Sequence, residues 1–433
     1  MARPAALPYA FCLVAMEGPD PYSHVGGLAV RVSGLAEALA AAGFPTTLVF
    51  QGDPDRPPVE RHGRLTLRRV AQDVARRYPA GVYEGEEVKR LHLEARLPEW
   101  LRDEVVAPAL HQGQLPVVAF EDWQTAGWAR RLSDVLHAAG TRARTLILWN
   151  ANHEYGAERI DWTALRYVAA ITTVSRFMRH RLARFGVDPV VIPNGIPTAS
   201  LRPVPAVAVA AVRRATGTRP LLVKMGRFTP DKRWLQAVRA LARLRADGHS
   251  HRLLIRGGRE PHGAEVLAAA RALGLRVVPW TDPIPDGHAL AAALRATAAA
   301  DVLDCQAFLP VPLLPVLHAA AAATLANSGY EPFGLVGLET MAAGGVAVVG
   351  ATGEDYARHL HNSLVIETDD PAELALAITA LDGDPALRRR LRAAARTTAR
   401  AYAWPVVLTG DLLPRLPVLA ARQAVEWPRA VGA

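Results

Sequence analysis

The stretch GYEPFGLVGLETMAAGGVAVVG, residues 329–350, carries the clearest structural pattern of the chain. It follows an apolar run at residues 323–326 that is typical of a buried strand, and it begins as a loop containing Pro332. We predict a helix that starts near Gly334 and ends at Gly344 and Gly345, because glycine favours the position just after a helix. The apolar run at 346–349 predicts the next strand. This order of elements indicates part of a parallel sheet.

Two glutamates, Glu331 and Glu339, lie on either side of the predicted helix start. Backbone N–H groups at a helix start have no partner within the helix, so this turn suits a phosphate or a sugar hydroxyl. The helix dipole adds about 0.3–1 kcal/mol at an exposed site. The two carboxylates would accept hydrogen bonds from hydroxyl groups of the same ligand, and an anion joined to a polyol describes a nucleotide sugar. The alternative is an ordinary strand-to-helix turn with no ligand.

Short apolar runs bounded by Gly, Pro, Asn or Asp alternate with segments of helical spacing along the whole chain. A chain of 433 residues exceeds a single core, so we predict an α/β protein with two doubly wound parallel-sheet domains. We expect the boundary in the Pro- and Val-rich segment 197–220, which holds the basic pair Arg213 and Arg214. The predicted strands are residues 11–16, 46–50, 116–120, 146–149, 171–174, 190–192, 221–225, 252–255, 276–279, 323–326, 346–349 and 364–366.

The composition argues against several classes of protein. The net charge is +9, but the basic residues are scattered and not interleaved with aromatic residues, so we expect no nucleic-acid partner. Cys12 and Cys305 lie in apolar surroundings, which favours a reducing compartment over a disulfide framework. We predict no signal peptide, no transmembrane segment and a cytoplasmic location. No Cys/His cluster has zinc spacing, so no metal site is predicted.

The spacing Glu331-x7-Glu339 resembles the signature of retaining glycosyltransferases with the GT-B fold, in particular the large family four group related to bacterial glycogen and starch synthases. The resemblance extends over about residues 10–405. It implies two Rossmann-like domains that face each other across a cleft. Residues 1–200 would form the acceptor-side domain and residues 201–405 the nucleotide-sugar-binding domain. The family also implies that residues 406–433 cross back to the first domain.

A cationic loop follows the predicted strand at 221–225 and contains Arg227 and Lys232. Two fixed cations can neutralise a diphosphate leaving group as the sugar bond breaks, without a metal ion. The loop is similar to the family's Gly-Arg…Lys donor-phosphate motif, which implies a catalytic role for both residues. The alternative is a pair of solvated loop cations.

Two glycines, Gly26 and Gly27, precede a predicted helix at 29–42. Paired glycines allow close approach of the backbone to a ligand and present free N–H groups, although such pairs commonly only make a turn. The segment resembles the Lys-x-Gly-Gly-Leu loop of glycogen and starch synthases, which implies donor binding. His24 stands where those synthases have lysine.

Two further segments of the first domain resemble family motifs. Residues 120–126 are similar to the synthases' "HDWHTA" segment, with Glu121 and Gln124 replacing histidines, and this implies that Asp122 contacts the acceptor. The alternative role of Asp122 is a helix N-cap. Residues 149–156 resemble the histidine-bearing loop of the family, which implies that His153 contacts the transferred hexose through its side chain or its carbonyl group.

In the second domain the resemblance implies that Glu331 and the amide groups of residues 333–335 (Phe333, Gly334 and Leu335) hold the sugar. Glu339 would bind the nucleotide ribose. The amide groups of Thr352 and Gly353 would reach the phosphates, unless that loop is a simple turn. Residues 281–313 are predicted to be an insertion beside the donor site.

The predicted function is a retaining transfer of a hexose, most readily glucose, from a nucleotide-diphosphate sugar to a hydroxyl acceptor, a glycan or a small molecule, with no cofactor. Alternatives on the same architecture are a sugar-nucleotide epimerase, a phosphorylase, a glucan polymerase of the glycogen-synthase type and a non-catalytic binding partner. His24 and Glu121 weaken the polymerase alternative. A phosphorylase needs a cofactor lysine, and this chain has few lysines.

Overall fold

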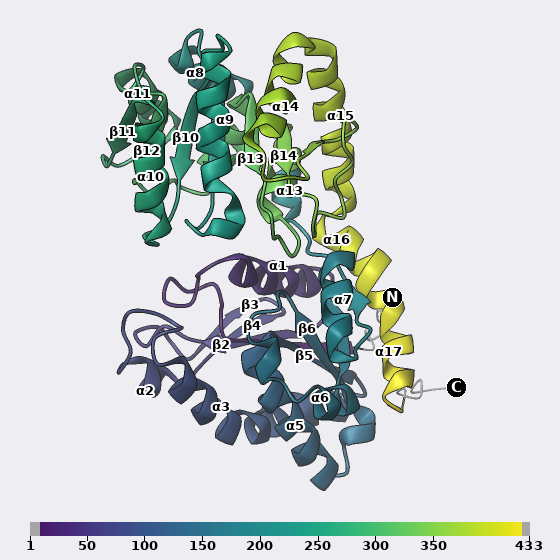
Figure 1. Cartoon of the computed structure of the whole chain (residues 1–433). Helices are drawn as coiled ribbons and strands as arrows, with labels where there is room; N and C mark the ends of the chain where they lie inside the picture. The colour runs from purple at the N-terminus through teal and green to yellow at the C-terminus, as the bar shows by residue number, and fades with distance from the viewer. Residues whose placement is uncertain (1–8, 427–433) are drawn as a thin grey trace, which may run out of the picture. The chain divides into compact units, whose positions relative to one another are not determined.

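The computed structural model describes residues 9–426, which form two compact units (Figure 1). Residues 9–195 and 404–426 make up the first unit, and residues 196–403 make up the second. The sequence analysis placed these divisions at residues 200 and 405. Each unit has one mostly parallel sheet with helices packed on both faces, so the predicted α/β architecture of two Rossmann-like units is confirmed.

The first unit has an eight-stranded sheet in the order β3-β4-β2-β1-β5-β6-β7-β8. Its strands are β1 (Tyr9–Ala15), β2 (Thr46–Gln51), β3 (Val59–His62), β4 (Leu65–Val70), β5 (Leu115–Glu121), β6 (Leu146–Ala151), β7 (Ala170–Thr173) and β8 (Val190–Val191). β3 pairs antiparallel to β4, and the other neighbours pair in parallel. Its helices are α1 (Gly27–Ala41), α2 (Gln72–Ala75), α3 (Glu86–Leu101), α4 (Ala107–His111), α5 (Ala126–Ala138), α6 (Trp162–Val168), α7 (Arg176–Leu182), α16 (Trp404–Val407) and α17 (Leu416–Arg422).

Alternate residues of the central strands of the first unit face two different core layers, as the two-residue period of a strand requires. Leu13 of β1 packs in the layer that contains α1, α16 and α17, whereas Val14 packs in the layer of α3, α5 and α6. Trp404 and Leu416, near the end of the chain, lie in the same core layer as Val32 of α1. The last helices therefore complete the core of the first unit.

The second unit has a seven-stranded parallel sheet in the order β11-β12-β10-β9-β13-β14-β15. Its strands are β9 (Leu221–Met225), β10 (Arg252–Arg256), β11 (Val277–Trp280), β12 (Val302–Cys305), β13 (Ala323–Ala326), β14 (Ala347–Val349) and β15 (Leu364–Val365). Its helices are α8 (Ala206–Thr216), α9 (Trp234–Ala246), α10 (His262–Ala272), α11 (Gly287–Ala296), α12 (Leu313–Ala320), α13 (Leu335–Ala342), α14 (Pro371–Gly383) and α15 (Pro385–Ala401). Leu222 faces α9, α10 and α14, and Val223 faces α8, α11 and α12.

The prediction of an insertion at residues 281–313 is wrong. This segment forms α11 and β12, and β12 lies inside the sheet, paired in parallel with both β10 and β11. The strand reads Val-Leu-Asp-Cys, and its four residues are buried. Asp304 interrupts the apolar run, which is why the sequence pattern did not indicate a strand here.

In each sheet the strand order reverses beside the first strand of the unit. β1 has β2 on one side and β5 on the other, and β9 likewise lies between β10 and β13. In open parallel sheets, ligands bind at such a switch point, beyond the ends of the strands. We call this side of each sheet its carboxyl edge. Each unit therefore offers a site at the residues that follow two of its strands. These strands are β1 and β5 in the first unit and β9 and β13 in the second.

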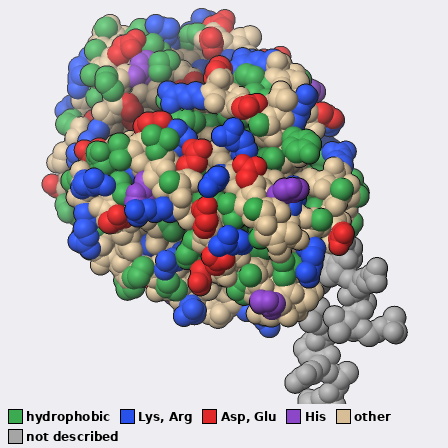
Figure 2. Space-filling model, turned by 90° about the horizontal axis from the view of Figure 1, so that it is seen from below, with side chains coloured by type: hydrophobic (Ala, Val, Ile, Leu, Met, Phe, Trp, Pro, Cys, Tyr) green, Lys and Arg blue, Asp and Glu red, His purple; other side chains and the backbone are tan. Residues whose placement is uncertain are grey.

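Two expectations from composition agree with the structure. Both cysteines are buried and free. On the face in Figure 2, Lys and Arg side chains are mixed with Asp and Glu, in line with the scattered charge of the sequence. Among residues 9–426 no helix has both the length and the apolar character that a membrane span requires.

Candidate functional site

Lys232 and Glu331 meet at the carboxyl edge of the second sheet. Lys232 lies in the loop after β9, Glu331 lies in the loop after β13, and the Lys232 Nζ is 2.7 Å from the Glu331 Oε2. Both side chains are about one-fifth exposed (20% each), so the pair is sheltered and still reachable by a ligand. The Ser328 hydroxyl donates to the same carboxylate oxygen at 3.1 Å. Two residues predicted to share one sugar-diphosphate are thus adjacent.

The two loops are also joined through their backbones. The Gly329 amide donates to the Asp231 carbonyl at 2.7 Å. Trp234, fully buried at the start of α9, donates its indole N–H to the Arg227 carbonyl at 2.8 Å and so fixes the backbone of the cationic loop. The Arg227 side chain is exposed, and within residues 9–426 it has no ion-pair partner. An exposed guanidinium on a fixed backbone can turn toward an anion at little cost.

Lys224, at the end of β9, is a member of this site that the sequence analysis left without a role. Its ammonium group donates to the Asn327 Oδ1 at 2.6 Å and to the Leu325 carbonyl at 3.2 Å, so it joins β9 to β13 at the switch point. The side chain is buried, and burial together with the nearby Lys232 lowers the pKa of Lys224 to about 7. The signal was its rarity: lysine occurs three times in a chain that otherwise uses arginine.

The predicted helix start is present. α13 begins at Leu335, just after Gly334, whose φ of 84° is a left-handed conformation that favours glycine. The amide groups of Phe333, Gly334 and Leu335 have no backbone acceptor in the part of the chain that the structure describes. The Phe333 ring is buried against Tyr356, with ring centroids 5.7 Å apart, and this contact fixes the turn. These amides form the positive end of the helix dipole, which suits an anion.

The loop after β14 supports Glu331 rather than presenting free amides. The Gly353 amide donates to the Glu331 carbonyl at 2.8 Å, and the Thr352 amide donates to the Glu354 carboxylate at 3.2 Å. Both amides that were predicted to reach the phosphates therefore already have acceptors within the protein. A side chain at position 353 would overlap the carbonyl oxygens of Glu331 and Pro332, so only glycine allows this approach.

Two carboxyl groups of this region have raised pKa values. Burial and the nearby Glu331 raise the pKa of Glu354 to about 8. Burial raises the pKa of Glu339 to about 7, and no cation or hydrogen-bond donor of the described residues offsets this effect. Glu339 keeps partial exposure to solvent, so it is a carboxyl group with free acceptor capacity on α13. Such a group suits a hydroxyl of a ligand.

Asp122 and His153 form the corresponding pair at the carboxyl edge of the first sheet. Asp122 follows β5 with a left-handed φ of 62°, and its Oδ1 accepts a hydrogen bond from the Asn152 amide at 2.8 Å. Its Oδ2 lies 3.3 Å from the His153 Nε2. The His153 Nδ1 accepts from the Tyr155 amide at 3.2 Å.

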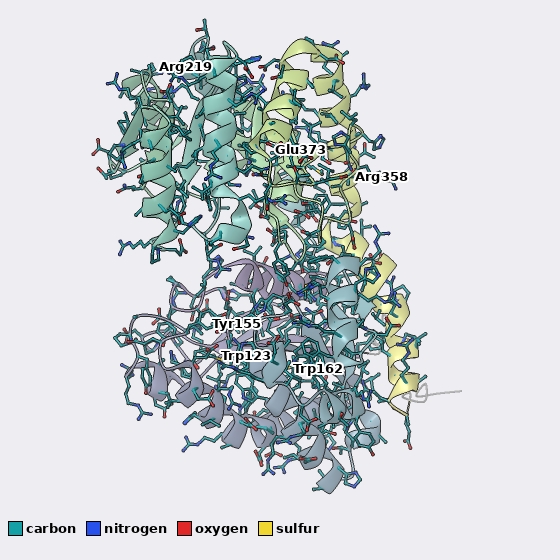
Figure 3. All side chains as sticks on the ribbon, in the orientation of Figure 1. Trp123, Tyr155, Trp162, Arg219, Arg358 and Glu373 are labelled. Carbon is teal, nitrogen blue, oxygen red and sulfur yellow. The ribbon has the colours of Figure 1, made fainter. Side chains whose placement is uncertain are left out.

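The Tyr155 amide therefore orients the His153 ring, and the neighbouring Asp122 Oδ2 is buried without a hydrogen-bond partner among the described residues. The alternative helix N-cap role is wrong, since Asp122 makes no side-chain cap hydrogen bond. Tyr155, labelled in Figure 3, lies on the same loop with 66% of its surface exposed.

Glu121 lies beneath this pair and is fully enclosed. Its carboxylate accepts hydrogen bonds from Arg31 at 3.2 Å, Asn150 at 2.9 Å and Asn152 at 2.7 Å. Burial nevertheless raises the pKa of Glu121 above its usual range. Glu121 therefore supports the Asp122 loop. The sequence analysis named it only as a replacement of a histidine.

The prediction that both glycines of the first loop present free amides is partly wrong. The Gly26 amide donates to the Glu17 carboxylate at 3.1 Å, and the Ala29 amide donates to the same oxygen at 3.0 Å. Glu17 is buried and follows β1, so a carboxylate already occupies the start of α1. A side chain at Gly26 would meet nothing within 4 Å, so packing does not explain this glycine.

One group within residues 9–426 has the composition of a metal site, although none was predicted. His249, His251 and Asp382 place their possible ligand atoms within 4.8 Å of one another. They come from the loop before β10 and from α14, which are distant in sequence, so no local spacing could have indicated them. None of the predicted site residues belongs to this group.

Comparison with known proteins agrees with the fold. Residues 25–200 match the model of Glycosyltransferase Family 4, and residues 210–398 match the model of Glycosyl transferases group 1. Sucrose-phosphate synthase from Thermosynechococcus elongatus has the same fold, with a TM-score of 0.65 over 95% of this chain and 100% of its own at 22% identity. The chain belongs to the GT-B glycosyltransferases of the family 4 group. It is accordingly a glycosyltransferase by family.

The curated relatives differ in how much of each protein is matched. The chain is 26% identical to D-inositol 3-phosphate glycosyltransferase of Thermobispora bispora over 88% of its length and 87% of that protein. It is 29% identical to alpha-maltose-1-phosphate synthase of Mycobacterium tuberculosis over 57% of its length, and this match spans 63% of the relative. The 36% identical match to D-inositol 3-phosphate glycosyltransferase of Thermomonospora curvata spans only 25% of that protein.

Proposed function

We propose that the protein transfers a hexose from a nucleotide-diphosphate sugar to a hydroxyl acceptor with retention of the anomeric configuration. The observation that carries this proposal is the contact between Lys232 and Glu331 at the switch point of the second sheet. It joins a cation suited to the diphosphate with a carboxylate suited to sugar hydroxyls, beside the open amides of α13.

The cationic loop supplies the catalytic step in this proposal. As the bond between sugar and phosphate breaks, negative charge grows on the diphosphate. Lys232 and Arg227 neutralise this charge and need no metal or other cofactor to do so. Entry of the diphosphate would draw Lys232 away from Glu331 and free the carboxylate for the sugar. Lys224 is a positioning residue that holds the two strands together.

The remaining residues take the roles of binding groups. The amides of Phe333, Gly334 and Leu335 bind an anionic or hydroxyl oxygen of the donor, and Glu339 binds the ribose hydroxyls. Thr352 and Gly353 hold the Glu331 backbone. In the first unit, His153 contacts the hexose and Asp122 lies beside His153 on the acceptor side. Gly26 and Gly27 allow the donor to approach the backbone before α1.

A donor panel tests the proposal directly. Purified protein is mixed with ADP-, UDP- and GDP-glucose and with GDP-mannose, and the shift in Tm is recorded. Binding at 100 times Kd stabilises the folded state by about 2.7 kcal/mol, so the true donor stands out from the others. A sugar nucleotide that raises the Tm of the native protein but not that of Lys232→Ala supports the site. No shift with any donor would contradict the proposal.

Product analysis then separates transfer from its alternatives. With the identified donor and a set of sugar, inositol and phosphosugar acceptors, NMR of the product reports the anomeric configuration, and retention is expected. Unchanged turnover in EDTA is expected for a metal-independent step. An altered sugar nucleotide formed without an acceptor would instead indicate an epimerase.

A further inference from the structure

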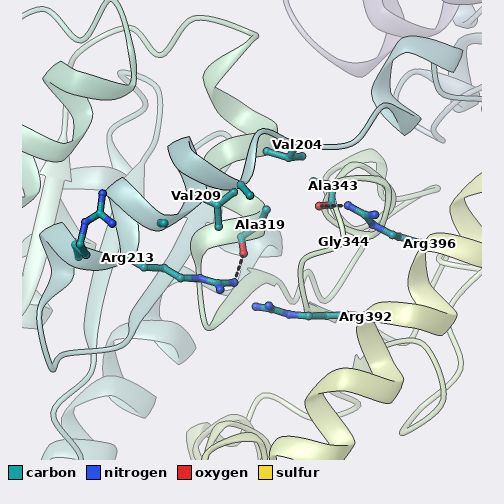
Figure 4. A pocket seen from close by; sticks show the side chains of 11 residues that line it. Val204, Val209, Arg213, Ala319, Ala343, Gly344, Arg392 and Arg396 are labelled. Atoms are coloured by element: carbon teal, nitrogen blue, oxygen red, sulfur yellow. Dashed lines mark hydrogen bonds between the residues drawn. The ribbon is translucent and has the colours of Figure 1, made fainter.

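A cavity of about 450 Å³ lies within the second unit and is lined by four arginines (Figure 4). Arg213 and Arg214 come from the end of α8, and Arg392 and Arg396 come from α15. The rest of the lining consists of alanine, valine and glycine residues, with no carboxylate among the described residues that form it. The sequence analysis had noted the pair Arg213 and Arg214 only as part of a linker.

The cavity lies at the opposite edge of the sheet from Lys232 and Glu331. Ala319 is near the end of α12, just before β13 begins, and Gly344 follows α13, just before β14 begins. These lining residues therefore mark the amino ends of the parallel strands, whereas the candidate donor site lies at their carboxyl ends. A ligand here would be separate from the sugar nucleotide.

Helix capping explains part of the arginine cluster. Arg213 donates to the Ala319 carbonyl at 2.8 Å, Arg392 to the Ala321 carbonyl at 3.1 Å and Arg396 to the Ala343 carbonyl at 3.5 Å, all at the ends of α12 and α13. Each helix end carries roughly half a negative charge, so the two ends offset about one of the four positive charges. Capping therefore leaves most of the charge uncompensated.

No carboxylate of the described residues compensates this remaining charge. None of the four arginines forms an ion pair with a carboxylate anywhere in residues 9–426, although many other arginines of the chain do. The Arg392 Nε is buried and has no hydrogen-bond partner there. Burial and the neighbouring Arg213 and Arg388 lower the pKa of Arg392 to about 10, as expected where cations are crowded together.

We propose that this cavity binds a small phosphate ester. Guanidinium groups from two helices can hold a phosphate through paired N–H donors, and the Val204 and Val209 side chains form an apolar wall for the organic part. The volume is within the usual range of about 300–1,000 Å³ for small-molecule sites. The inference does not depend on the donor site, because it uses different residues at a different edge of the sheet.

Calorimetric titration tests the proposal with glucose 6-phosphate and inorganic phosphate as probes and glucose as the neutral control. The titrations use Lys232→Ala protein, so that the candidate donor site does not contribute. Saturable binding of glucose 6-phosphate is expected, with no binding of glucose. In this background the pair Arg213→Gln and Arg392→Gln should weaken binding by roughly tenfold or more, because two charge-assisted contacts are lost.

The matched control is the double variant Arg389→Gln and Arg390→Gln. Both arginines are exposed, lie on α15 as Arg392 does, and are outside the cavity. This control should bind the phosphate ester as tightly as its parent. Equal affinities in the cavity variant and the control variant would overturn the proposal, and so would a lack of binding in the Lys232→Ala parent. Loss of donor binding alone would leave this result untouched, so the two proposals fail separately.

Arg214→Gln tests whether misfolding, and not loss of charge, explains weaker binding in the double variant. The Arg214 side chain makes no hydrogen bond or ion pair within residues 9–426, so its loss should not unfold the protein, and we expect a roughly threefold weaker affinity. Sedimentation with vesicles that contain a phosphoinositide tests whether the phosphate belongs to a lipid headgroup. Binding to the vesicles that is lost in the Arg213→Gln and Arg392→Gln variant and kept in the control would show that it does.

Discussion

The carboxyl edges of the two sheets share a topology and differ in charge. In the first unit the switch point carries Glu17, Glu121 and Asp122, which are all buried. In the second unit it carries Lys224 and Lys232 beside Glu331. The same strand order therefore supports an acidic site in one unit and a site that pairs lysines with a carboxylate in the other. Topology selects the place of a site, and the residues that follow the strands select its chemistry.

Removal of a cation from the second edge should have the largest effect. Lys232→Ala is expected to lower kcat about 10²–10³-fold, or roughly 3–4 kcal/mol, because the growing charge on the diphosphate loses a fixed partner. Arg227→Ala should act in the same direction. Steady-state kinetics with the identified donor measures both.

The control for these variants is Arg243→Ala, a cation on the exposed face of α9 whose nearest carboxylate is the exposed Asp247. It should keep wild-type kinetics and an unchanged Tm. Wild-type turnover in both Lys232→Ala and Arg227→Ala would rule out the catalytic role of the cationic loop.

The buried Glu354 should make stability depend on pH. Because its folded pKa is raised to about 8, the folded state holds a proton that the unfolded state releases near its ordinary pKa of 4.5. Its contribution to stability is complete below about pH 4.5 and is lost as the pH rises toward 8, by up to about 1.4 kcal/mol per pH unit.

Denaturant unfolding of wild type and Glu354→Gln at pH 6 and pH 8 measures this contribution. The difference between their free energies of unfolding should change by about 2 kcal/mol in favour of the variant at the higher pH. Lys224 has the opposite sign but is present in both proteins, so it cancels. A difference that does not change with pH would show that Glu354 is ionised in the folded protein.

Gly353→Ala tests the close approach that supports Glu331. The added methyl group would overlap two carbonyl oxygens, so we expect a loss of about 1–3 kcal/mol in the free energy of unfolding. Gly383→Ala is the matched control, since a side chain there meets nothing within 4 Å and α14 favours alanine. Equal stability of the two variants would mean that the loop after β14 moves freely.

The smallest effect is expected at the first edge. Asp122→Asn removes the charge that faces the His153 Nε2 but keeps the shape of the side chain, so kcat should fall about tenfold, near 1.4 kcal/mol. A fall in Tm with an unchanged kcat would indicate a purely structural role.

The sequence by itself determined most of the strands and the positions of the candidate loops along the chain. Its apolar runs predicted all strands except three. None of the residues of β3 is buried, β4 alternates buried and half-buried residues, and β12 contains Asp304, so these three did not stand out. The helix from Trp234 to Ala246 has the predicted bounds, because its amphipathic period is a local property. The strand-to-helix turn at Gly334 is local too, and glycine marked it.

Only the tertiary structure decided which groups face one another. The contact of Lys232 with Glu331 joins residues 99 positions apart, and the Arg213–Arg392 cluster depends on packing of α8 and α15 around α12 and α13. It also decided that the Gly26, Thr352 and Gly353 amides are already bonded and that β12 completes the sheet. The periodicity of a segment shows which of its sides is buried. Contacts between residues distant in sequence depend on the strand order, and no local pattern contains that order.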